Sequence, residues 1–443
     1  MSQATLDPHA AVVATAGGTA EGTLTTADGK PLKASLAAAE AHRRRRALFL
    51  VLPLLLFVLV TFIAPIGQML MRSVSDPRFI EYEDLATGEI TPVMVNLRDW
   101  FDANPPGTEP DEAAFAALAA DLVQLGELRA QGNVGTRINY EAPGTRSLFT
   151  KSTRRADDLE APFREAILDI DDDWADPQLW QAMRGASSRF TANFYLAAMD
   201  LEPAPDGGVQ RVDERQRVYV TLFQRTAILS VVITAMTLIL GFPIAHLLAT
   251  LPLRYSNLLM IFVLLPFWTS LLVRTTSWIV LLQSQGVVND LGVAAGLIED
   301  SSRLQMIYNQ TGTIVAMTHI LLPFMVLPLY SVMRPIDPSY VRAARSLGAN
   351  SWTAFRRVYL PQTIPGIGAG ALLVFILAVG YYITPALVGG SSGQLISNLI
   401  AFHMTNSLNW SLAAALAALL LAGVLVLYWL YDRIVGIDNL KLG

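Results

Sequence analysis

Residues 337–365, DPSYVRAARSLGANSWTAFRRVYLPQTIP, form a polar, basic interruption between two long apolar segments. Asp337 can cap a short helix that starts with a proline, and Gly348 can end that helix in the left-handed conformation. The following Asn-Ser pair can cap a second helix, which Pro361 and Pro365 are expected to stop before the chain re-enters apolar sequence. The stretch therefore predicts two short helices around a glycine turn, set between two membrane spans.

Apolar side chains mark one face of each expected helix. They are Tyr340, Val341, Ala344 and Leu347 in the first helix and Trp352, Phe355 and Tyr359 in the second. A basic amphipathic pair of this kind suits the groove of a partner protein. The alternative is an ordinary cytoplasmic loop, because such loops are basic in membrane proteins generally.

The order of residues in this stretch carries a resemblance to a known family. It reads Arg-Ala-Ala at 342–344, Leu-Gly-Ala at 347–349, Phe at 355, Val at 358, Leu-Pro at 360–361 and Pro-Gly-Ile at 365–367. This pattern resembles the cytoplasmic loop of permease subunits of binding-protein-dependent ABC importers, in which a short helix docks into a cleft of the ATPase subunit. The resemblance implies an ATPase-coupling role for Arg342, Ala343, Ala344, Leu347, Gly348, Ala349, Phe355, Leu360 and Pro361.

Two positions depart from the family's pattern. Arg342 stands where the family usually has Glu, and Ser346 stands where many members have Asp. The apolar and glycine positions carry the fit, so docking is expected to survive. If the family forms an ion pair through this Glu, the corresponding ion pair here would have its charges reversed, with the cation on this chain.

The composition is that of a polytopic membrane protein. Of the 443 residues 53% are hydrophobic, and the mean hydropathy is +0.41. Residues 73–216 hold 27 acidic and 13 basic side chains, whereas the rest of the chain holds 10 and 19, a separation that membrane topology produces. No lysine stands in a phosphate-binding Gly-Lys loop, so we expect no cofactor and no ATP hydrolysis by this chain.

Apolar runs divide the chain into tails, spans and one large polar block. We expect a disordered cytoplasmic tail at 1–42, a first transmembrane helix at 43–72 rather than a cleaved signal peptide, an extracytoplasmic domain at 73–216, a permease core at 217–435 and a cytoplasmic tail at 436–443. The five core spans are expected near 218–250, 257–283, 310–333, 366–388 and 411–431, with the coupling loop at 335–365. The arginines at 43–46 then share a side with Arg254, the coupling loop, Arg433 and Lys441, which predicts a bacterial inner-membrane protein with both termini cytoplasmic.

The chain has no Cys, so residues 73–216 are expected to fold around an apolar core of their own without disulfides. Segments 111–131 and 177–199 are expected to be helical. Aromatic anchors are Trp100, Phe115, Trp174, Trp180, Phe190, Phe194 and Tyr195. The acidic run 169–173 lacks the Gly and the distal Glu of a calcium loop, which favours a solvated turn and no metal. We favour a folded cap over the translocation pathway, and the alternative is a passive spacer.

Two membrane segments, LLPFWTSLLVRTTSWIVLL and VGYYITPALVGG, resemble the permeases that serve spermidine and putrescine and their relatives that serve opines and other small amines. A polyamine would meet carboxylates or aromatic rings along its route. The five core spans lack Asp and Glu but offer Trp268, Trp278, Tyr381 and Tyr382 as candidates for the substrate pathway. Core or interfacial packing is the alternative for these aromatic residues.

Arg274 is the remaining pathway candidate, since it is the one charge well inside the expected span 257–283. It could form an ion pair or gate in the pathway, or its side chain could extend to the membrane surface. His246 and His319 each lie within a helical turn of a proline, and no second ligand is spaced to join them. We interpret both as hydrogen-bonding residues between helices rather than metal ligands.

The sequence thus predicts an all-α polytopic membrane protein with six transmembrane helices of the type I ABC importer permease kind and a large insertion between the first and second. The resemblance implies a non-catalytic permease subunit for spermidine or putrescine. Its implied partners are an ATPase dimer that binds ATP, a second permease, an extracytoplasmic solute-binding protein and lipid. No nucleic acid is expected as a partner. An opine, an amino acid or another small amine derivative is the alternative solute. An ATP-independent secondary transporter or channel is an alternative of another class. A membrane-anchored enzyme is disfavoured, because residues 73–216 lack His and Cys.

Overall fold

The computed structural model describes residues 32–204 and 208–435, with side chains from 41 to 433, and the chain divides into two units, Met1–Gln68 and Met69–Gly443. The first unit contains helix α1, Leu32–Val58, which continues through the π turn η1, Leu59–Ile63, into α2, Ala64–Arg72. Residues 32–42 are therefore helical, contrary to the predicted disorder, because the alanine-rich run there favours a helix. The rest of that predicted tail, 1–31, and the predicted tail 436–443 lie outside the described residues.

Within the described residues, five helical stretches are long and apolar enough to cross a membrane, and a sixth crossing is possible if one bent pair of helices counts as a single span. The five are Ala41–Arg72, α10 at Tyr219–Thr250, α14 at Gln310–Met333, Ser351–Gly380 and the stretch Trp410–Arg433 of α21, which itself ends at Val435. The bent pair falls on the predicted span 257–283. It consists of α11, Leu253–Trp268, and the segment Leu271–Ala294, which are bent by 99°. This segment contains α12, Leu271–Leu282, and α13, Val287–Ala294.

The predicted break at Pro361 and Pro365 is wrong, because the helix runs without interruption from the loop into the membrane span. It consists of α16, Ser351–Ala354, a π turn η7, Phe355–Tyr359, and α17, Leu360–Gly380. Pro361 lies in the first turn of α17, directly after the π turn, where the widened backbone has room for the proline ring. The predicted span 366–388 instead ends at Gly380, and the chain continues into α18, Ile383–Val388, α19, Gly390–Gly393, and α20, Ile396–Thr405.

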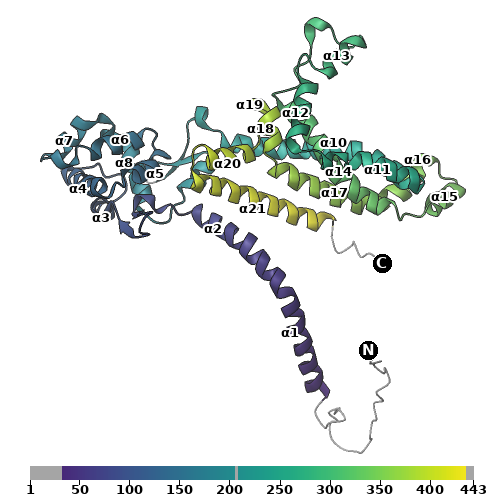
Figure 1. Ribbon diagram of the computed structural model, residues 1–443, viewed down its shortest axis with the longest axis horizontal. Helices are drawn as coiled ribbons and strands as arrows, with labels where there is room; N and C mark the ends of the chain where they lie inside the picture. The colour runs from purple at the N-terminus through teal and green to yellow at the C-terminus, as the bar shows by residue number, and fades with distance from the viewer. Residues whose placement is uncertain (1–31, 205–207, 436–443) are drawn as a thin grey trace, which may run out of the picture. The chain divides into compact units, whose positions relative to one another are not determined.

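Helices α10, α14 and α17 pack together and form the apolar centre of the membrane part (Figure 1). Buried side chains at the centre of this packing are Leu229, Ile233, Met317, Leu321, Met325, Val326, Leu329 and Val374. Small residues on α17 let it approach α14 closely. A Cβ atom added to Gly366 would lie 3.0 Å from Val332 Cβ, and one added to Gly370 would lie 2.8 Å from Met325 Sδ. Alanine at Gly366 would therefore push the two helices apart, whereas alanine at Gly370 would displace the flexible Met325 side chain.

The polar block, residues 73–216, is mainly helical and has a core of its own. Its helices are α3 at Val95–Ala103, α4 at Glu112–Leu128, α5 at Gln131–Asn139, α6 at Thr145–Thr153, α7 at Phe163–Ile170, α8 at Pro177–Ser187 and α9 at Asn193–Ala198. Two antiparallel pairs of short strands accompany them: β1, Glu81–Glu83, with β2, Ile90–Pro92, and β3, Leu201–Pro203, with β4, Val209–Arg211. The predicted core is confirmed, with Trp174, Phe115 and Phe149 almost completely buried.

Two expectations for this block need correction. The predicted helix 177–199 is interrupted between α8 and α9, where Thr191 N–H donates to the Val74 carbonyl and Phe190 pairs with Ser75 as an isolated bridge. Phe190 is consequently exposed rather than buried. The backbone of 188–192 thus bonds to a segment more than a hundred residues earlier, which local helix propensity does not reveal.

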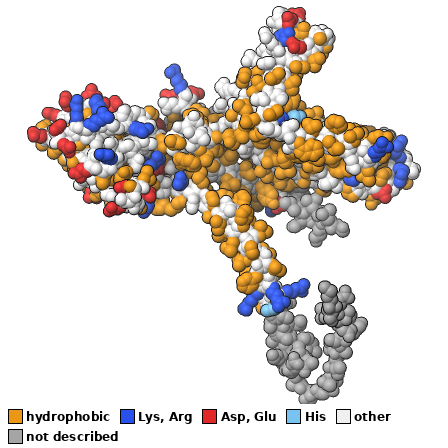
Figure 2. Space-filling view, viewed as in Figure 1, with side chains coloured by type: hydrophobic (Ala, Val, Ile, Leu, Met, Phe, Trp, Pro, Cys, Tyr) orange, Lys and Arg blue, Asp and Glu red, His pale blue; other side chains and the backbone are white. Residues whose placement is uncertain are grey.

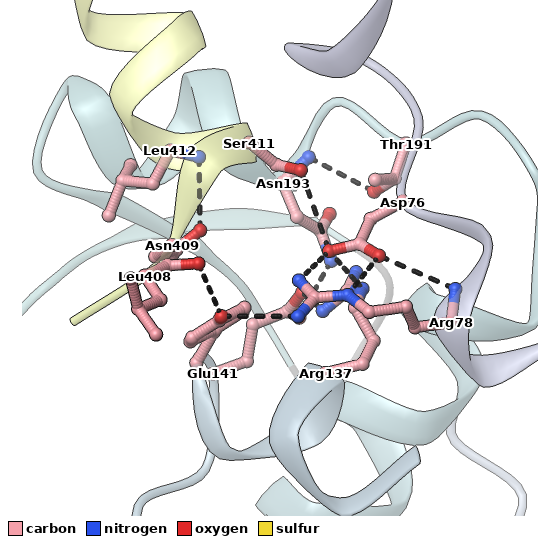
Figure 3. Close-up of polar contacts among 11 residues, drawn as sticks. Asp76, Arg78, Arg137, Glu141, Thr191, Asn193, Leu408, Asn409, Ser411 and Leu412 are labelled. Carbon is pink, nitrogen blue, oxygen red and sulfur yellow. Dashed lines mark hydrogen bonds and ion pairs between the residues drawn. The ribbon is translucent and has the colours of Figure 1, made fainter. Parts of the chain in front are cut away.

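Charged side chains connect the polar block to the start of α21 (Figure 3). Asp76 receives hydrogen bonds from Arg78 and lies 4.0 Å from the Nε atom of Arg137, which is almost fully buried and also pairs with Glu141 at 2.7 Å. Ser411, just inside α21, donates a 3.5 Å hydrogen bond to Asp76. Burial alone would raise the pKa of Asp76, but the hydrogen bonds and charge of Arg78, with the charge of Arg137, hold this pKa below its usual range.

Tyr140 adds a second connection, since its hydroxyl donates to the Leu408 carbonyl at 2.8 Å and receives a bond from Arg78 at 3.2 Å. Apolar packing continues it, because α9 contacts α21 through Phe194, Ala198, Leu412 and Leu416. The polar block and the first turns of α21 are therefore joined by both charged and apolar contacts.

We predict that Arg137→Ala destabilises this junction by about 3–5 kcal/mol, because it removes the buried cation that pairs with Glu141 and lies beside Asp76. The midpoint of unfolding, followed by tryptophan fluorescence and by protease cleavage within 73–216, measures the loss. The control is Lys151→Ala, which removes an exposed ion pair with Asp171 and should cost less than about 1 kcal/mol. Equal midpoints for the two variants would contradict the prediction.

Candidate functional site

The coupling-loop candidates begin on a short helix, α15, Ser339–Ser346. Asp337 accepts a hydrogen bond from Ser339 N–H at 2.8 Å, so the helix starts one residue later than the proline predicted as its first position. Gly348 has φ = +94°, and its N–H donates to the Arg345 carbonyl at 3.0 Å, as predicted for a left-handed helix end. Asn350 then caps α16 by accepting from Thr353 N–H at 2.7 Å.

The turn between α15 and α16 exposes its largest apolar side chain, that of Leu347, on the protein surface. Leu347 is 89% exposed, and Tyr340 and Trp352 are 55% and 67% exposed. Exposed arginines surround them, namely Arg342, Arg345, Arg356 and Arg357. Figure 2 shows basic side chains, in blue, over the segment that Figure 1 labels α15 and α16. An apolar tip within a cationic rim is typical of a docking surface.

An aromatic stack fixes the second half of the loop to α10. Phe355 stacks between Trp352 and Tyr359, with ring centroids 5.8 and 5.9 Å away, and meets Phe242 of α10 edge-on at 6.0 Å. The Tyr359 hydroxyl hydrogen-bonds to His246 Nδ1 at 3.0 Å. The hypothesis that His246 connects helices is therefore confirmed, and the predicted alignment of the three loop aromatics is confirmed with it.

Arg334 fixes the first half of the loop to the same helix. Its Nη1 atom donates to the carbonyls of Ala249 and Leu251 at 2.7 and 3.0 Å, at the end of α10. A cation there satisfies carbonyls that the helix leaves open and complements its dipole. Sequence reasoning missed Arg334 and Phe242. Phe242 lies inside α10, and Arg334 directly follows α14, but neither position reveals its partner in the sequence.

The structure separates the predicted coupling residues into two groups. Arg342, Ala343, Ala344, Leu347, Gly348 and Ala349 lie on α15 and its turn, whereas Phe355, Leu360 and Pro361 belong to the helix that enters the membrane. Arg342 has no carboxylate within ion-pair distance among the described residues. Hydrogen bonds from Ser339, and then the charge of Arg342, lower the pKa of Asp337. The cationic face of α15 is thus available to a partner.

Arg274 lies at the break between α11 and α12. Its guanidinium donates to the carbonyls of Pro266 and Thr269, the latter at 3.0 Å, and its Nε donates to the Thr269 hydroxyl at 3.2 Å. These carbonyls end α11 and lack helical partners, so the arginine satisfies them. Neither sequence hypothesis included this local role, and the gate stays a prediction.

The other pathway candidates lie on α12 and beside the end of α17. Trp278 donates from Nε1 to His319 Nδ1 at 3.2 Å, which confirms that His319 connects helices. The carbonyls of Tyr381 and Tyr382 accept hydrogen bonds from Ser397 and Asn398, both at 2.7 Å. Thr275 and Thr384 approach to 3.3 Å and join α12 to α18. Trp268, the last residue of α11, is 73% exposed.

Comparisons with known proteins match the membrane part of the chain. The family model for the inner membrane component of binding-protein-dependent transport systems matches residues 226–435. The spermidine/putrescine transport system permease protein PotB of Escherichia coli is 34% identical over 211 residues, which are 47% of this chain and 76% of the relative. PotB of Haemophilus influenzae is 34% identical over 224 residues, covering 51% and 78%.

Two solved structures also match about half of the chain. One is a bacterial ABC transporter that imports the acidic polysaccharide alginate, with 22% identity, a TM-score of 0.39 and coverage of 49% of this chain and 79% of that one. The other is the bacterial alginate ABC transporter in complex with its pentasaccharide-bound periplasmic protein, with 19% identity, a TM-score of 0.41 and coverage of 51% and 80%.

The family match starts inside α10 and leaves out the polar block, but it includes the whole coupling loop and the helices that hold it. The relatives are aligned over about three quarters of their own length. The apolar helices agree with a multi-pass protein of the inner membrane. The chain therefore belongs to the inner membrane components of binding-protein-dependent transport systems, as a permease subunit of an ABC importer.

Proposed function

We propose that this permease moves a small polyamine, of the spermidine or putrescine class, inward across the membrane by alternating access, driven by a dimer of ATPase subunits. The observation that carries the coupling part of the proposal is the exposed Leu347 in a loop that hydrogen-bonds to α10 on both sides of its turn, through Arg334 and Tyr359. ATP binds to the ATPase subunits, and the permease needs no cofactor of its own. A second permease and an extracytoplasmic solute-binding protein complete the assembly, and both termini of this chain are cytoplasmic.

Docking would begin with the apolar tip of the loop. Leu347 and the neighbouring aromatic rings enter a cleft of the ATPase, and burial of these side chains supplies the affinity. The arginines around them require acidic residues on the rim of that cleft, because an unpaired cation in an interface is costly. In the ion pair at Arg342 the permease then carries the positive charge, whereas a permease with Glu at this position carries the negative one.

Movement of the docked loop would reach the pathway through one helix. Ser351–Gly380 runs from the loop to the end of α17, directly before Tyr381. When the ATPases close on ATP, the loop moves as a rigid body and the helix carries that displacement to Tyr381 and the adjoining α18. The side of the pathway that is open changes as a result.

The polyamine assignment rests on the names of the relatives and on charge. The polar block carries 27 acidic and 13 basic side chains. Placed outside the membrane, this net negative block would raise the local concentration of a polycation. Aromatic rings of the pathway candidates can then receive the ammonium groups through cation–π contacts. An opine, amino acid or other small amine derivative remains the alternative solute.

We predict that Leu347→Asp lowers recovery of the ATPase with the tagged permease from gently solubilised membranes by tenfold or more, because it replaces about 1.5–3 kcal/mol of apolar burial with a charge. Mass spectrometry of the co-purified proteins quantifies the loss. Leu85→Asp is the matched control, since Leu85 is 96% exposed in the polar block and should leave recovery unchanged. Undiminished recovery with Leu347→Asp would mean that the ATPase docks elsewhere.

We predict that Gly348→Pro leaves the protein in the membrane but uncouples ATP hydrolysis from uptake. Proline cannot adopt the φ of +94° found at Gly348 and cannot donate to the Arg345 carbonyl. Solute moved per ATP hydrolysed in proteoliposomes should fall at least tenfold. Gly296→Pro is the control, because Gly296 has φ = +70° and donates to the Val293 carbonyl but lies after α13, away from the loop. Retained coupling in Gly348→Pro, or an equal loss in the control, counts against the proposal.

We predict that cells lacking the gene for this chain lose uptake of labelled spermidine or putrescine and regain it with the intact chain, but not with Leu347→Asp. A competition panel of polyamines, opines and amino acids defines the solute. Chain-dependent uptake of an opine or an amino acid, without polyamine uptake, would replace the solute and leave the coupling proposal intact. If Leu347→Asp lost the ATPase but the intact chain restored uptake of no solute in the panel, the import proposal as a whole would be overturned.

A further inference from the structure

A pocket of about 550 Å³ opens in the polar block, among helices α3, α4, α7 and α8. These four helices pack on one another and lie together in the block (Figure 1). The exposed loop between α3 and α4, with the run Pro106-Gly107-Thr108-Glu109, forms part of the rim. The volume is within the range of pockets that hold small organic molecules, about 300–1,000 Å³.

The inner wall of this pocket is aromatic. The ring of Trp180 lies at its centre, with centroids 5.1 Å from Phe115, 6.1 Å from Trp100 and 6.4 Å from Phe101, all edge-to-face. Both indole N–H groups are already occupied, since Trp100 donates to Asp111 at 3.0 Å and Trp180 donates to the Trp174 carbonyl at 2.8 Å. The wall is therefore apolar and has no free indole donor. Its four rings are 1–9% exposed, so the apolar body of a ligand would meet only their exposed parts.

Two guanidinium groups lie over this aromatic wall. Arg164 is 5.9 Å from the ring centroid of Phe115, and Arg184 is 4.8 Å from that of Phe101. Neither has a carboxylate within ion-pair distance in the described part of the chain. Glu109 is the one carboxylate residue among the described lining residues, so the lining carries a net positive charge inside an otherwise acidic block.

Arg184 is held in place, since its Nη1 atom donates to the carbonyls of Phe101 and Asn104 at 2.9 and 2.8 Å. Burial lowers the pKa of Arg184, and the charge of Asp102 opposes this change only in part. An anion beside the guanidinium would offset the cost of burying its charge. The pocket thus has a hydrogen-bonded cation at Arg184, an exposed cation at Arg164 and an apolar wall.

We propose that this pocket binds a small organic anion, with a flat or aliphatic body against Trp180 and its neighbours and a carboxylate, sulfonate or phosphate group at Arg164 and Arg184. The pocket lies outside the range that the transport family matches and far along the chain from the coupling loop. The polar block is in this respect a receptor for a ligand of opposite charge to the proposed solute. The alternative is that the two arginines only stack on the rings and support the fold.

The test uses the full chain in lipid nanodiscs and two fluorinated probes of similar shape, 4-fluorobenzenesulfonate and uncharged 4-fluorobenzyl alcohol. Broadening of the fluorine resonance, corrected with empty nanodiscs, gives the affinity of each probe. We expect the sulfonate to bind at least fivefold more tightly than the alcohol. Arg164→Gln should weaken the sulfonate at least fivefold and leave the alcohol unchanged, and Arg164→Lys should recover part of the sulfonate affinity.

Arg146→Gln is the matched control, because Arg146 is an exposed arginine of the same block with no ion pair among the described residues and lies outside the pocket. It should change neither probe. Arg164 is exposed, and none of its guanidinium hydrogen-bonding atoms has a protein partner in the described residues, so its variants are expected to fold, which unchanged tryptophan emission verifies. Equal binding of both probes, no binding of the sulfonate, or sulfonate binding that Arg164→Gln does not alter would each overturn the proposal.

Discussion

Helix α10 is capped at both ends by charged side chains from distant parts of the chain, and the rest of the structure depends on this arrangement. At its start, the carboxylate of Asp200 accepts hydrogen bonds from the N–H groups of Val218, Tyr219 and Val220 at 2.8–3.1 Å. At its end, Arg334 binds the last carbonyls. An anion at the first turn and a cation at the last both complement the helix dipole. Since α10 has 32 residues, or about 48 Å of length, it fixes the polar block at one end and the coupling loop at the other.

Much of this architecture could be predicted from the sequence, because the relevant signals are local. Apolar length gave the positions of α10 and α14, and the glycine at 348 gave the turn of the coupling loop. Capping by Asn350 and the alignment of Trp352, Phe355 and Tyr359 follow from residue type and helical spacing alone. Each of these features is decided within a few residues of the chain.

The remaining features depend on partners that lie far away in sequence. The helix continues past Pro361 because a π turn precedes it. The predicted helix 177–199 is interrupted between α8 and α9 because the backbone there bonds to Val74. The carbonyls to which Arg274 donates lack helical partners only because α11 ends at Trp268 and the chain bends there. Likewise, a lone arginine after a span does not reveal that its target is the end of another helix. Pairwise geometry of this kind has no signature in a single sequence.

The helix Ser351–Gly380 would act as a lever if it tilted about the contact of Phe355 and Tyr359 with α10. The 21 residues of α17 beyond that point span about 31 Å, so a tilt of about 10° would move the far end by about 5 Å. The arm on the loop side is shorter, and displacement is therefore amplified toward Tyr381. A permease built in this way can open a passage of molecular width with a cytoplasmic stroke of only a few ångströms.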